Sequence, residues 1–400
     1  MKSDFKRSHR RPWADVLLII LFAGLLWLPT ADYFGHLDRT QSPDENRLLA
    51  PPPRLSRPDL AGVRACVAAT EAYFNDHFGF RRRLVRWNQQ WRARLYRSGD
   101  GANHVIVGQN GWLYFTEADM IEHYLCLKSF TPQELQSWQR LLERRRDWLA
   151  ARGIQYLFII PPDKQSIYPE DLPSWLLQAR PAGGRTKLDQ FVEYMKAHST
   201  VEILDLRPAL SAGKKAAPTY LQNDSHWNLY GGFLGSQEVI KKLSQQFPAL
   251  PPLELGDFDW TNAPATGGDL AAMMGAAQKP EGNSFVFSPK PPLVAPQMQV
   301  ITNIIRIRNP DDRAKINCLV ENPALTNRPV DAVVFHDSYG RAFRQFFGYS
   351  FHRTVFVWEN KEFNPKVISE NHPQIVISEM LERYFNIEDP EEMIASEKLP

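Results

Sequence analysis

Two short segments of the sequence hold residue types that nucleophilic catalysis requires. The first is the run DSHW, in which Asp224 precedes His226 by two positions. On a loop that enters a helix, this spacing can place the carboxylate beside one imidazole nitrogen and leave the other nitrogen free to accept a proton. The alternative is a polar turn in which Asp224 caps the following helix and His226 is merely exposed. Taken alone, this segment leaves both interpretations open.

The second segment is HDSYG, which follows the apolar run DAVVF and contains Ser338. The apolar run predicts a β-strand, and ligands of open α/β sheets bind beyond the carboxyl ends of the strands. A serine on a tight strand-to-helix turn is exposed there, and backbone N–H groups at the helix start can stabilise an oxyanion. The alternative is that Asp337 or Ser338 is an ordinary helix N-cap. The two segments support each other, because one α/β sheet can bring both loops to the same edge.

The elements that must position these segments begin at Thr131. This residue is predicted to form a capping box with Glu134, with Pro132 at the first helical position and Gly153 just beyond the helix end. The run IQYLFIIPP that follows is continuously apolar, as expected of a strand buried on both faces. Helices and strands then alternate: a helix over 185–198, the strand VEILDL, a helix from DSHW to about Phe247, the strand DAVVF, the helix GRAFRQFFG, and the strands RTVFVW and PQIVISEM. This alternation predicts an α/β fold with a mostly parallel sheet covered by helices on both faces.

The N-terminal segment predicts a membrane anchor. Residues 2–11 carry five basic side chains against one acid, and the apolar run VLLIILFAGLLWL follows at 16–28. Basic residues before an apolar stretch stay on the cytoplasmic side, so the rest of the chain is expected to be exported. With its aromatic ends, the segment 13–34 is long enough for a span, which needs ~20 residues. A cleaved signal peptide is the alternative, but no good pair of small residues at A-x-A spacing follows the run, which favours an uncleaved signal-anchor.

The rest of the chain divides around one large domain. Residues 251–330 interrupt the α/β alternation and are predicted to be a long insertion, a candidate for substrate contacts. Residues 64–97 have a helical pattern, and VIVGQNGWLYF predicts a β-hairpin with Asn110-Gly111 at its turn. The predicted segments are a tail and anchor over 1–35, a proline-rich linker over 36–62, the catalytic domain over 63–390 and a tail over 391–400.

Composition excludes some classes of protein. The chain has 400 residues, of which 43% are hydrophobic and 23% charged, as in globular proteins with a real core. The net charge is +2 and the basic residues are spread along the chain, which gives no reason to propose nucleic acid as a partner. The 11 tryptophans either bind sugar rings or fill the core. Cys66, Cys126 and Cys318 permit one disulfide at most and form no metal-ligand pattern, so they support no zinc site.

Several motifs together resemble a known family. In chain order they are FNDHFGFR, VIVGQNGWLYF, PPDKQSIYPEDLP, DSHW, FHDSYG and SEMLERYF, and they extend from about Tyr73 to Tyr384. They are similar to the membrane-anchored and periplasmic alginate O-acetyltransferases of the AlgJ/AlgX group, whose catalytic domain resembles the SGNH hydrolases. The resemblance implies Ser338 as nucleophile, His226 as general base and Asp224 as its orienting acid. It also implies a permuted order, with Asp and His before Ser, the reverse of ordinary SGNH hydrolases.

The same resemblance implies an activity and its partners. It implies a periplasmic O-acetyltransferase that acetylates an exported polysaccharide, alginate-like or another, without a cofactor. A multi-spanning membrane acyltransferase would pass the acetyl group across the inner membrane. Two departures from the family stand out. His336 occupies a position where glycine is frequent, so its side chain could narrow the site or move the turn. The chain is also too short for the carbohydrate-binding module of the longer relatives.

Other residues near the two segments are weaker candidates. Lys164 follows the first buried strand and could bind an acidic sugar or an acyl donor, or form a structural salt bridge. Tyr339 and Arg341 flank the serine and are candidates for substrate contacts, although Arg341 could instead be a solvated helix residue. Trp227 is a further candidate, which could instead pack over His226 or in the core.

Glu379 and Arg383 have i,i+4 spacing, which predicts a surface helix pair.

Two rival functions use the same residues. An esterase that removes acetyl groups from a carbohydrate would have the identical triad, with water as acceptor. A non-catalytic polysaccharide-binding assembly protein would retain the fold, and it would be preferred if Asp224, His226 and Ser338 did not converge.

Overall fold

The structure is a computed structural model that describes residues 104–397 and 399, apart from 267, 275–279, 302–316, 328–329 and 360–362, together with a few short stretches nearer the N-terminus. The chain forms two compact units, 1–94 and 95–400. Most of the predicted anchor, most of the linker and most of the predicted helix over 64–97 lie outside the described residues. Among the residues described, none of the helices is both long enough and apolar enough to cross a membrane.

One mixed β-sheet organises the second unit. Within the described residues it has seven strands in the order β4-β3-β11-β9-β10-β8-β7. The five strands from β4 to β10 are mutually parallel, as the continuous apolar runs predict. Their bounds are Gln155–Ile160 (β3), Ile203–Asp205 (β4), Asp331–His336 (β9), Arg353–Trp358 (β10) and Ile375–Glu379 (β11). The carboxyl ends of these strands therefore share one edge, and Ser338 follows one of them.

The prediction of a mostly parallel sheet needs one correction. Strand β8 (Asn317–Glu321) pairs antiparallel with β10, and β7 (Gln297–Ile301) pairs antiparallel with β8. Both strands come from the segment predicted as an insertion. They extend the sheet at the β10 edge, so part of the insertion belongs to the main sheet.

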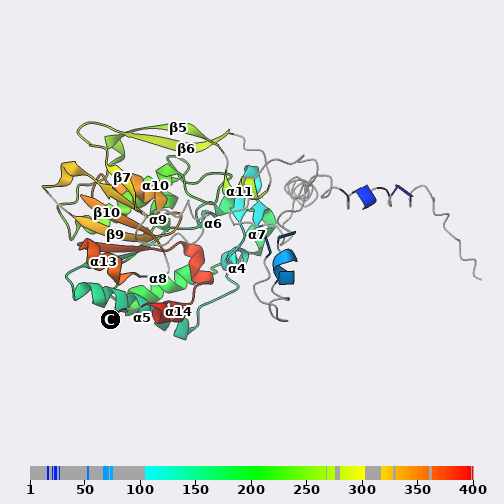
Figure 1. The fold of residues 1–400 in the computed structure, drawn as a ribbon, viewed down its shortest axis with the longest axis horizontal. Coiled ribbons are helices and arrows are strands. Elements are labelled where there is room, and N and C mark those ends of the chain that lie inside the picture. The colour runs from blue at the N-terminus through cyan, green and yellow to red at the C-terminus, as the bar shows by residue number, and fades with distance from the viewer. Residues whose placement is uncertain are drawn as a thin grey trace, which may run out of the picture. The chain divides into compact units, whose positions relative to one another are not determined.

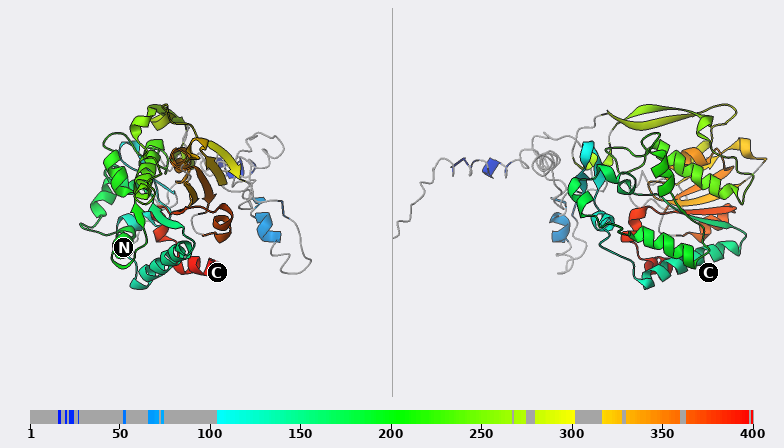
Figure 2. Two further views of the ribbon diagram at one scale, coloured as in Figure 1. Left: turned by 90° about the vertical axis from the view of Figure 1, so that its left-hand side faces the viewer. Right: turned by 180° about the vertical axis from the view of Figure 1, so that it is seen from behind.

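Helices cover the two faces of the sheet, as the alternation predicts (Figures 1 and 2). One apolar core, which includes Leu157, Val334 and Ile377, packs against α7 (Ser174–Ala179), α9 (Arg207–Gly213), α10 (Leu229–Ser244) and α12 (Arg341–Phe347). The other core includes Phe158, Val333 and Val376 and packs against α5 (Pro132–Ala150), α8 (Lys187–His198), α13 (Pro365–Asn371) and α14 (Pro390–Ser396). Alternate residues of β3, β9 and β11 thus face opposite cores.

The remaining elements lie around this sandwich. Strand β1 (Val105–Val107) and β2 (Leu113–Phe115) form the predicted hairpin, with Asn110 and Gly111 at positive φ in its turn. The insertion also contains a second hairpin, β5 (Phe258–Thr266) with β6 (Pro280–Pro289), and the helix α11 (Asp269–Met273). Short helices complete the described chain: α4 (Met120–Tyr124), α6 (Lys164–Ile167), and 3-10 turns at Gln109–Gly111, Pro169–Asp171, Leu255–Asp257, Pro323–Leu325 and Glu382–Asn386.

Local signals at the helix ends agree with the structure. Thr131 and Glu134 form the predicted capping box of α5, and Gly153 adopts a positive φ shortly after the helix. Residues 391–396, assigned to a tail by the sequence, belong to α14, which packs against α5. Just beyond α14, Glu397 forms a buried ion pair with Arg145. The domain therefore extends past its predicted end.

Aromatic residues mostly fill these cores. Trp138 and Trp227 are buried, while Trp175 is exposed. A separate aromatic cluster joins the β5–β6 hairpin to α10 and α12 through residues such as Phe233, Phe287 and Phe346. The three cysteines are free thiols.

Candidate active site

Asp224, His226 and Ser338 converge in the structure, as the sequence predicts. The Nε2 atom of His226 lies 2.8 Å from the Ser338 hydroxyl oxygen. Its Nδ1 atom lies 2.7 Å from Oδ1 of Asp224. One imidazole nitrogen thus faces a carboxylate and the other faces a hydroxyl, which is the geometry that general-base activation of a serine needs. A non-catalytic polysaccharide-binding protein would be preferred only if these three residues did not converge, and they do.

Asp224 stabilises the loop that contains His226. The Oδ1 atom of Asp224 also accepts the backbone N–H of His226, at 2.9 Å, so the carboxylate closes a tight local turn. Asp224 does not cap the next helix, because Asn228 is the N-cap residue of α10 and accepts from the Gly231 N–H. The structural alternative for Asp224 is therefore wrong.

The turn that holds Ser338 is built from buried neighbours. Strand β9 ends at His336, and the Asp337 side chain accepts the backbone N–H of Tyr339 at 2.8 Å. Ser338 is half-buried, whereas the residues on both sides of it are buried. The N-cap residue of α12 is Gly340, so neither Asp337 nor Ser338 has the capping role considered as the alternative. The tight turn leaves the serine as the accessible side chain.

Electrostatics favour an ionised Asp224. Burial alone would raise its pKa, but the hydrogen bond from His226 and the charge of the imidazole outweigh burial and hold the pKa well below its usual range. The backbone N–H of Asp269 adds a further donor, 3.1 Å from Oδ2. A permanently negative Asp224 stabilises the imidazolium that forms when His226 takes a proton.

Comparisons with known proteins agree with this geometry. Residues 105–289 match the family described as the SGNH hydrolase-like domain of the acetyltransferase AlgX. Over those residues the chain is similar to the AlgJ/AlgX group. The matched region contains Asp224 and His226 and stops before Ser338, so the position of the serine rests on the geometry given above.

Two curated relatives carry the same name. The chain is 28% identical to the probable alginate O-acetylase AlgJ of Azotobacter vinelandii, over 35% of this chain and 34% of that protein. It is 26% identical to the protein of that name from Pseudomonas fluorescens, over 45% of this chain and 43% of that protein. The alignments thus span less than half the length of these relatives.

A solved structure shows the same fold. Bacillus cereus PatB1 with a sulfonyl adduct has a TM-score of 0.52 with this chain at 16% sequence identity, covering 72% of this chain and 99% of that one. At this level of identity the likeness concerns the fold alone.

Two weaker candidates occupy structural positions in this domain. The Lys164 ammonium is buried and donates to the backbone carbonyls of Leu113, at 2.8 Å, and Gln222, at 3.2 Å. Burial lowers its pKa to about 7. Lys164 thus ties the β1–β2 hairpin to the His226 loop. Trp227 is buried and donates from its indole to the Tyr339 carbonyl, which agrees with the predicted core role.

The other two flank the serine. Tyr339 is buried, its hydroxyl donates to the Ser225 carbonyl, and its ring centre lies 5.1 Å from that of His226. Tyr339 therefore packs beside the imidazole of His226. Arg341 is exposed, and its guanidinium lies 5.0 Å from the centre of the Trp358 ring at the end of β10.

His336 neither fills the site nor displaces the turn. It is fully buried, its Nδ1–H donates to the Asp337 carbonyl, and its Nε2 accepts from Arg344 at 3.1 Å. Burial and the charge of Arg344 lower its pKa to about 3, so the ring is neutral. Gly340 packs directly on this ring, and a Cβ there would lie 2.5 Å from His336 Cβ.

The prediction of a surface helix pair at Glu379 and Arg383 is wrong. Glu379 ends strand β11 and is fully buried, where its Oε2 accepts the Asp337 N–H at 2.8 Å. Arg383 lies in a 3-10 turn and donates from Nε to Asp163 at 2.7 Å. The i,i+4 spacing misled because a strand ends between the two residues. The motif SEMLERYF instead contributes buried polar groups beneath the nucleophile.

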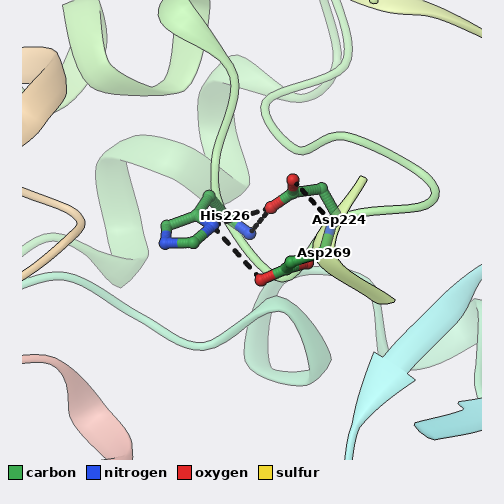
Figure 3. A group of neighbouring side chains, drawn as sticks. All are labelled: Asp224, His226 and Asp269. Carbon is green, nitrogen blue, oxygen red and sulfur yellow. Dashed lines mark hydrogen bonds and ion pairs between the residues drawn. The ribbon is translucent and has the colours of Figure 1, made fainter. Parts of the chain in front are cut away.

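Asp269 is a site residue that the sequence did not single out. Its Oδ2 lies 3.5 Å from Nδ1 of His226, close to Asp224 (Figure 3). The only signal was an acidic residue at the start of a short apolar stretch within the predicted insertion, which is too common to mark a site.

Proposed function

We propose that this protein is an O-acetyltransferase that moves an acetyl group, through an acyl-enzyme on Ser338, to a hydroxyl of an exported polysaccharide. The observation that carries the proposal is the continuous hydrogen-bonded chain from Asp224 through His226 to Ser338. The match of residues 105–289 to the SGNH hydrolase-like acetyltransferase domain supports acetyl transfer as the chemistry of these residues. The names of the relatives, alginate O-acetylases, suggest an alginate-like acceptor.

The geometry defines how the two half-reactions proceed. His226 takes the hydroxyl proton at Nε2 while the Ser338 oxygen bonds to the acetyl carbonyl carbon of the donor. The tetrahedral intermediate collapses, the bond to the donor's leaving group breaks, and that group takes the proton from His226. The acceptor hydroxyl then repeats the sequence: it loses its proton to His226, attacks the acetyl-serine, and leaves as the ester while Ser338 regains a proton. Asp224 stays ionised throughout and stabilises the imidazolium in both halves.

The chain order supports a permuted version of the SGNH arrangement. Asp224 and His226 come from the loop before α10, and Ser338 comes from the later turn after β9. We include this order in the proposal because the carboxyl edge of the sheet hosts all three side chains.

We also propose where the enzyme works and where its acetyl group comes from, starting from the N-terminal segment. We propose that the segment 13–34 anchors the chain in the inner membrane, that 36–62 links it to the domain, and that the domain works in the periplasm. A multi-spanning membrane acyltransferase would then supply the acetyl group beside the anchor. Recovery of full transfer activity from the purified chain without any membrane partner would contradict that partnership.

The test is intact mass spectrometry of the full-length chain after exposure to an activated acetyl ester, beside Ser338→Ala. We expect one acetyl group on Ser338 in the wild type and none at that position in the variant. Addition of oligosaccharide acceptors should discharge the acetyl group onto sugar. Discharge onto water alone would support the carbohydrate esterase, and absence of any adduct and any turnover would overturn both enzymatic functions.

A further inference from the structure

A second carboxylate faces the imidazole of His226. Oδ2 of Asp269 lies 3.5 Å from Nδ1 of His226, on the same ring edge that Asp224 contacts at 2.7 Å (Figure 3). Both carboxylates and the imidazole are partly exposed, with 31%, 18% and 27% of the side-chain surface accessible for Asp269, Asp224 and His226. Solvent therefore reaches this cluster, which is not part of the buried core.

Asp269 is tied to the His226 loop by several hydrogen bonds. Its Oδ1 accepts the backbone N–H of Ser225 at 2.7 Å, and its Oδ2 accepts the Ser225 hydroxyl. In return, the Asp269 N–H donates to Oδ2 of Asp224 at 3.1 Å. Side-chain and backbone hydrogen bonds thus connect the start of α11 to the loop that contains His226.

The backbone around Asp269 fits closely against the same loop. The Ala271 N–H donates to the Asn223 carbonyl at 3.1 Å. A Cβ on Gly268 would lie 2.2 Å from that carbonyl oxygen, so only glycine permits this approach. These contacts fix where the Asp269 carboxylate stands relative to the imidazole.

We propose that Asp269 is a second positioning carboxylate for His226, supplied by the insertion, which fixes Asp224 and Ser225 and adds negative charge at the Nδ1 edge of the imidazole. This inference rests on the proposed function, because it assigns a role in activating Ser338. The charge of Asp269 opposes loss of the proton from Nδ1 and favours the imidazolium formed during each half-reaction.

The two carboxylates differ in how readily they ionise. Burial and the negative charge of Asp224 raise the pKa of Asp269, whereas the pKa of Asp224 is held low. The two pKa values move apart because the carboxyl group that ionises second is opposed by the negative charge of the first. As the pH falls, Asp269 takes up a proton before Asp224 does.

The same three side chains could in principle hold a divalent metal ion, since their ligand atoms lie within 4.8 Å of one another. A metal would need the Nδ1 lone pair, yet Nδ1 lies 2.7 Å from a carboxylate oxygen and has to carry the proton if Nε2 is to act as the base. Each carboxylate oxygen already accepts a hydrogen bond from an N–H or O–H donor. The arrangement therefore favours proton sharing, and metal binding becomes one outcome of the test.

Other charged groups contribute to any pH dependence of this cluster. Groups from three further elements interact electrostatically with Asp269: Lys164 on α6, Tyr339 on the turn after β9, and Arg341 on α12. All three are unchanged in the variants below, so a difference between variants reports on Asp269.

The experiment measures the rate at which a sulfonyl fluoride or 4-nitrophenyl acetate modifies Ser338 in the full-length chain, as a function of pH. The variants are Asp269→Asn, which removes the charge, Asp269→Glu, which retains it, and the control Asp259→Asn on the exposed face of β5. For Asp269→Asn we expect a rate about tenfold lower and an acidic limb about one pH unit lower, since one pKa unit corresponds to a tenfold change. Asp269→Glu should keep the acidic limb of the wild type, and Asp259→Asn should match the wild type throughout.

The outcomes separate this inference from the proposed function. If the wild type is not modified at Ser338, both fail. If the wild type is modified but Asp269→Asn has the same rate and limb, only the role of Asp269 fails. A limb shifted equally in Asp269→Glu would reduce Asp269 to a structural contact, and this comparison decides the matter even if Asp269→Asn does not fold. Inhibition of the wild type by micromolar zinc that a chelator reverses and Asp269→Asn abolishes would replace the inference with a metal site.

Discussion

Two pairs of carboxylic acids lie near Ser338 and differ in how readily they ionise: the upper pair, Asp224 and Asp269, and the lower pair, Asp337 and Glu379. Asp224 and Asp269 lie beside His226, are partly exposed, and accept hydrogen bonds from several N–H groups. Asp337 belongs to the turn that holds Ser338, and Glu379 contacts that turn. Both are buried, with 5% and 0% of their surface accessible. Burial raises the pKa of both members of the lower pair, and the negative charge of Asp337 raises the pKa of Glu379 further.

The difference shows what decides whether paired acids carry charge or a proton. Asp224 accepts hydrogen bonds from the His226 imidazole and from the backbone N–H groups of His226 and Asp269, so ionisation is stabilised despite partial burial. Glu379 has one backbone donor, the Asp337 N–H, and no cation contributes to its pKa, so it retains its proton. The upper pair adds negative charge beside His226, whereas in the lower pair Glu379 favours its protonated form next to the Asp337 carboxylate.

The largest expected effect comes from the upper pair. Asp224→Asn replaces the acceptor at Nδ1 with an amide and disturbs the tautomer of His226, so we expect the rate of Ser338 modification to fall about 10⁴-fold. The measurement is the second-order rate constant with an activated ester, with Asp259→Asn as the matched control. A loss of less than about tenfold would show that Asp224 does not set the state of His226.

The nucleophile turn can be tested through its packing. Gly340→Ala would place a methyl group 2.5 Å from Cβ of the buried His336, which has no room to move. We expect the free energy of unfolding to fall by about 1–3 kcal/mol, with slower modification of Ser338 because the turn shifts. Gly256→Ala is the control, since a Cβ there meets open space. Equal stability of the two variants would mean that His336 does not brace the turn.

The lower pair predicts a pH-dependent stability. The pKa of Glu379 is raised in the folded state above its unfolded value of 4.5, so its contribution is fully present below pH 4.5 and is lost as the pH rises through the folded-state pKa. Glu379→Gln stays neutral and can accept the Asp337 N–H while donating to the Asp337 carboxylate. We therefore expect this variant to exceed the wild type in stability at alkaline pH and to lose that advantage toward pH 4.5.

Denaturant unfolding at several pH values measures this effect. The control is Glu370→Gln on the exposed side of α13, which should not change the pH dependence. A constant difference between Glu379→Gln and the wild type at all pH values would show that folding does not raise the pKa of Glu379.

The smallest effect is expected from the link between the upper pair and its loop. Ser225→Ala removes the hydroxyl that donates to Asp269 and leaves the Ser225 backbone N–H in place. We expect a loss of about 1 kcal/mol in the free energy of unfolding. The rate of Ser338 modification should change far less than in Asp224→Asn. A rate loss as large as that of Asp224→Asn would show that Ser225, and not the carboxylates, positions His226.

Much of the parallel core could be predicted because its signals are local. The capping box at Thr131 and the apolar runs that became β3, β9 and β11 depend on residues close together in the chain. The antiparallel strands β7 and β8 could not be predicted as members of the same sheet, because nothing in their own sequence identifies β10 as a partner. The surface placement of Glu379 failed for a related reason: spacing alone does not show that a strand ends between it and Arg383.

The sequence by itself determined which side chains could form a triad. Asp224 and His226 are two residues apart, so their contact follows from a local turn, and Ser338 is placed by the strand that precedes it. Only the tertiary structure decided what surrounds them. Asp269 reaches His226 from 43 residues away in the chain (269 − 226) and Glu379 reaches Asp337 from 42 residues away. Whether a carboxyl group keeps its proton depends on burial and on neighbours in space, and neither is encoded at the position of the residue itself.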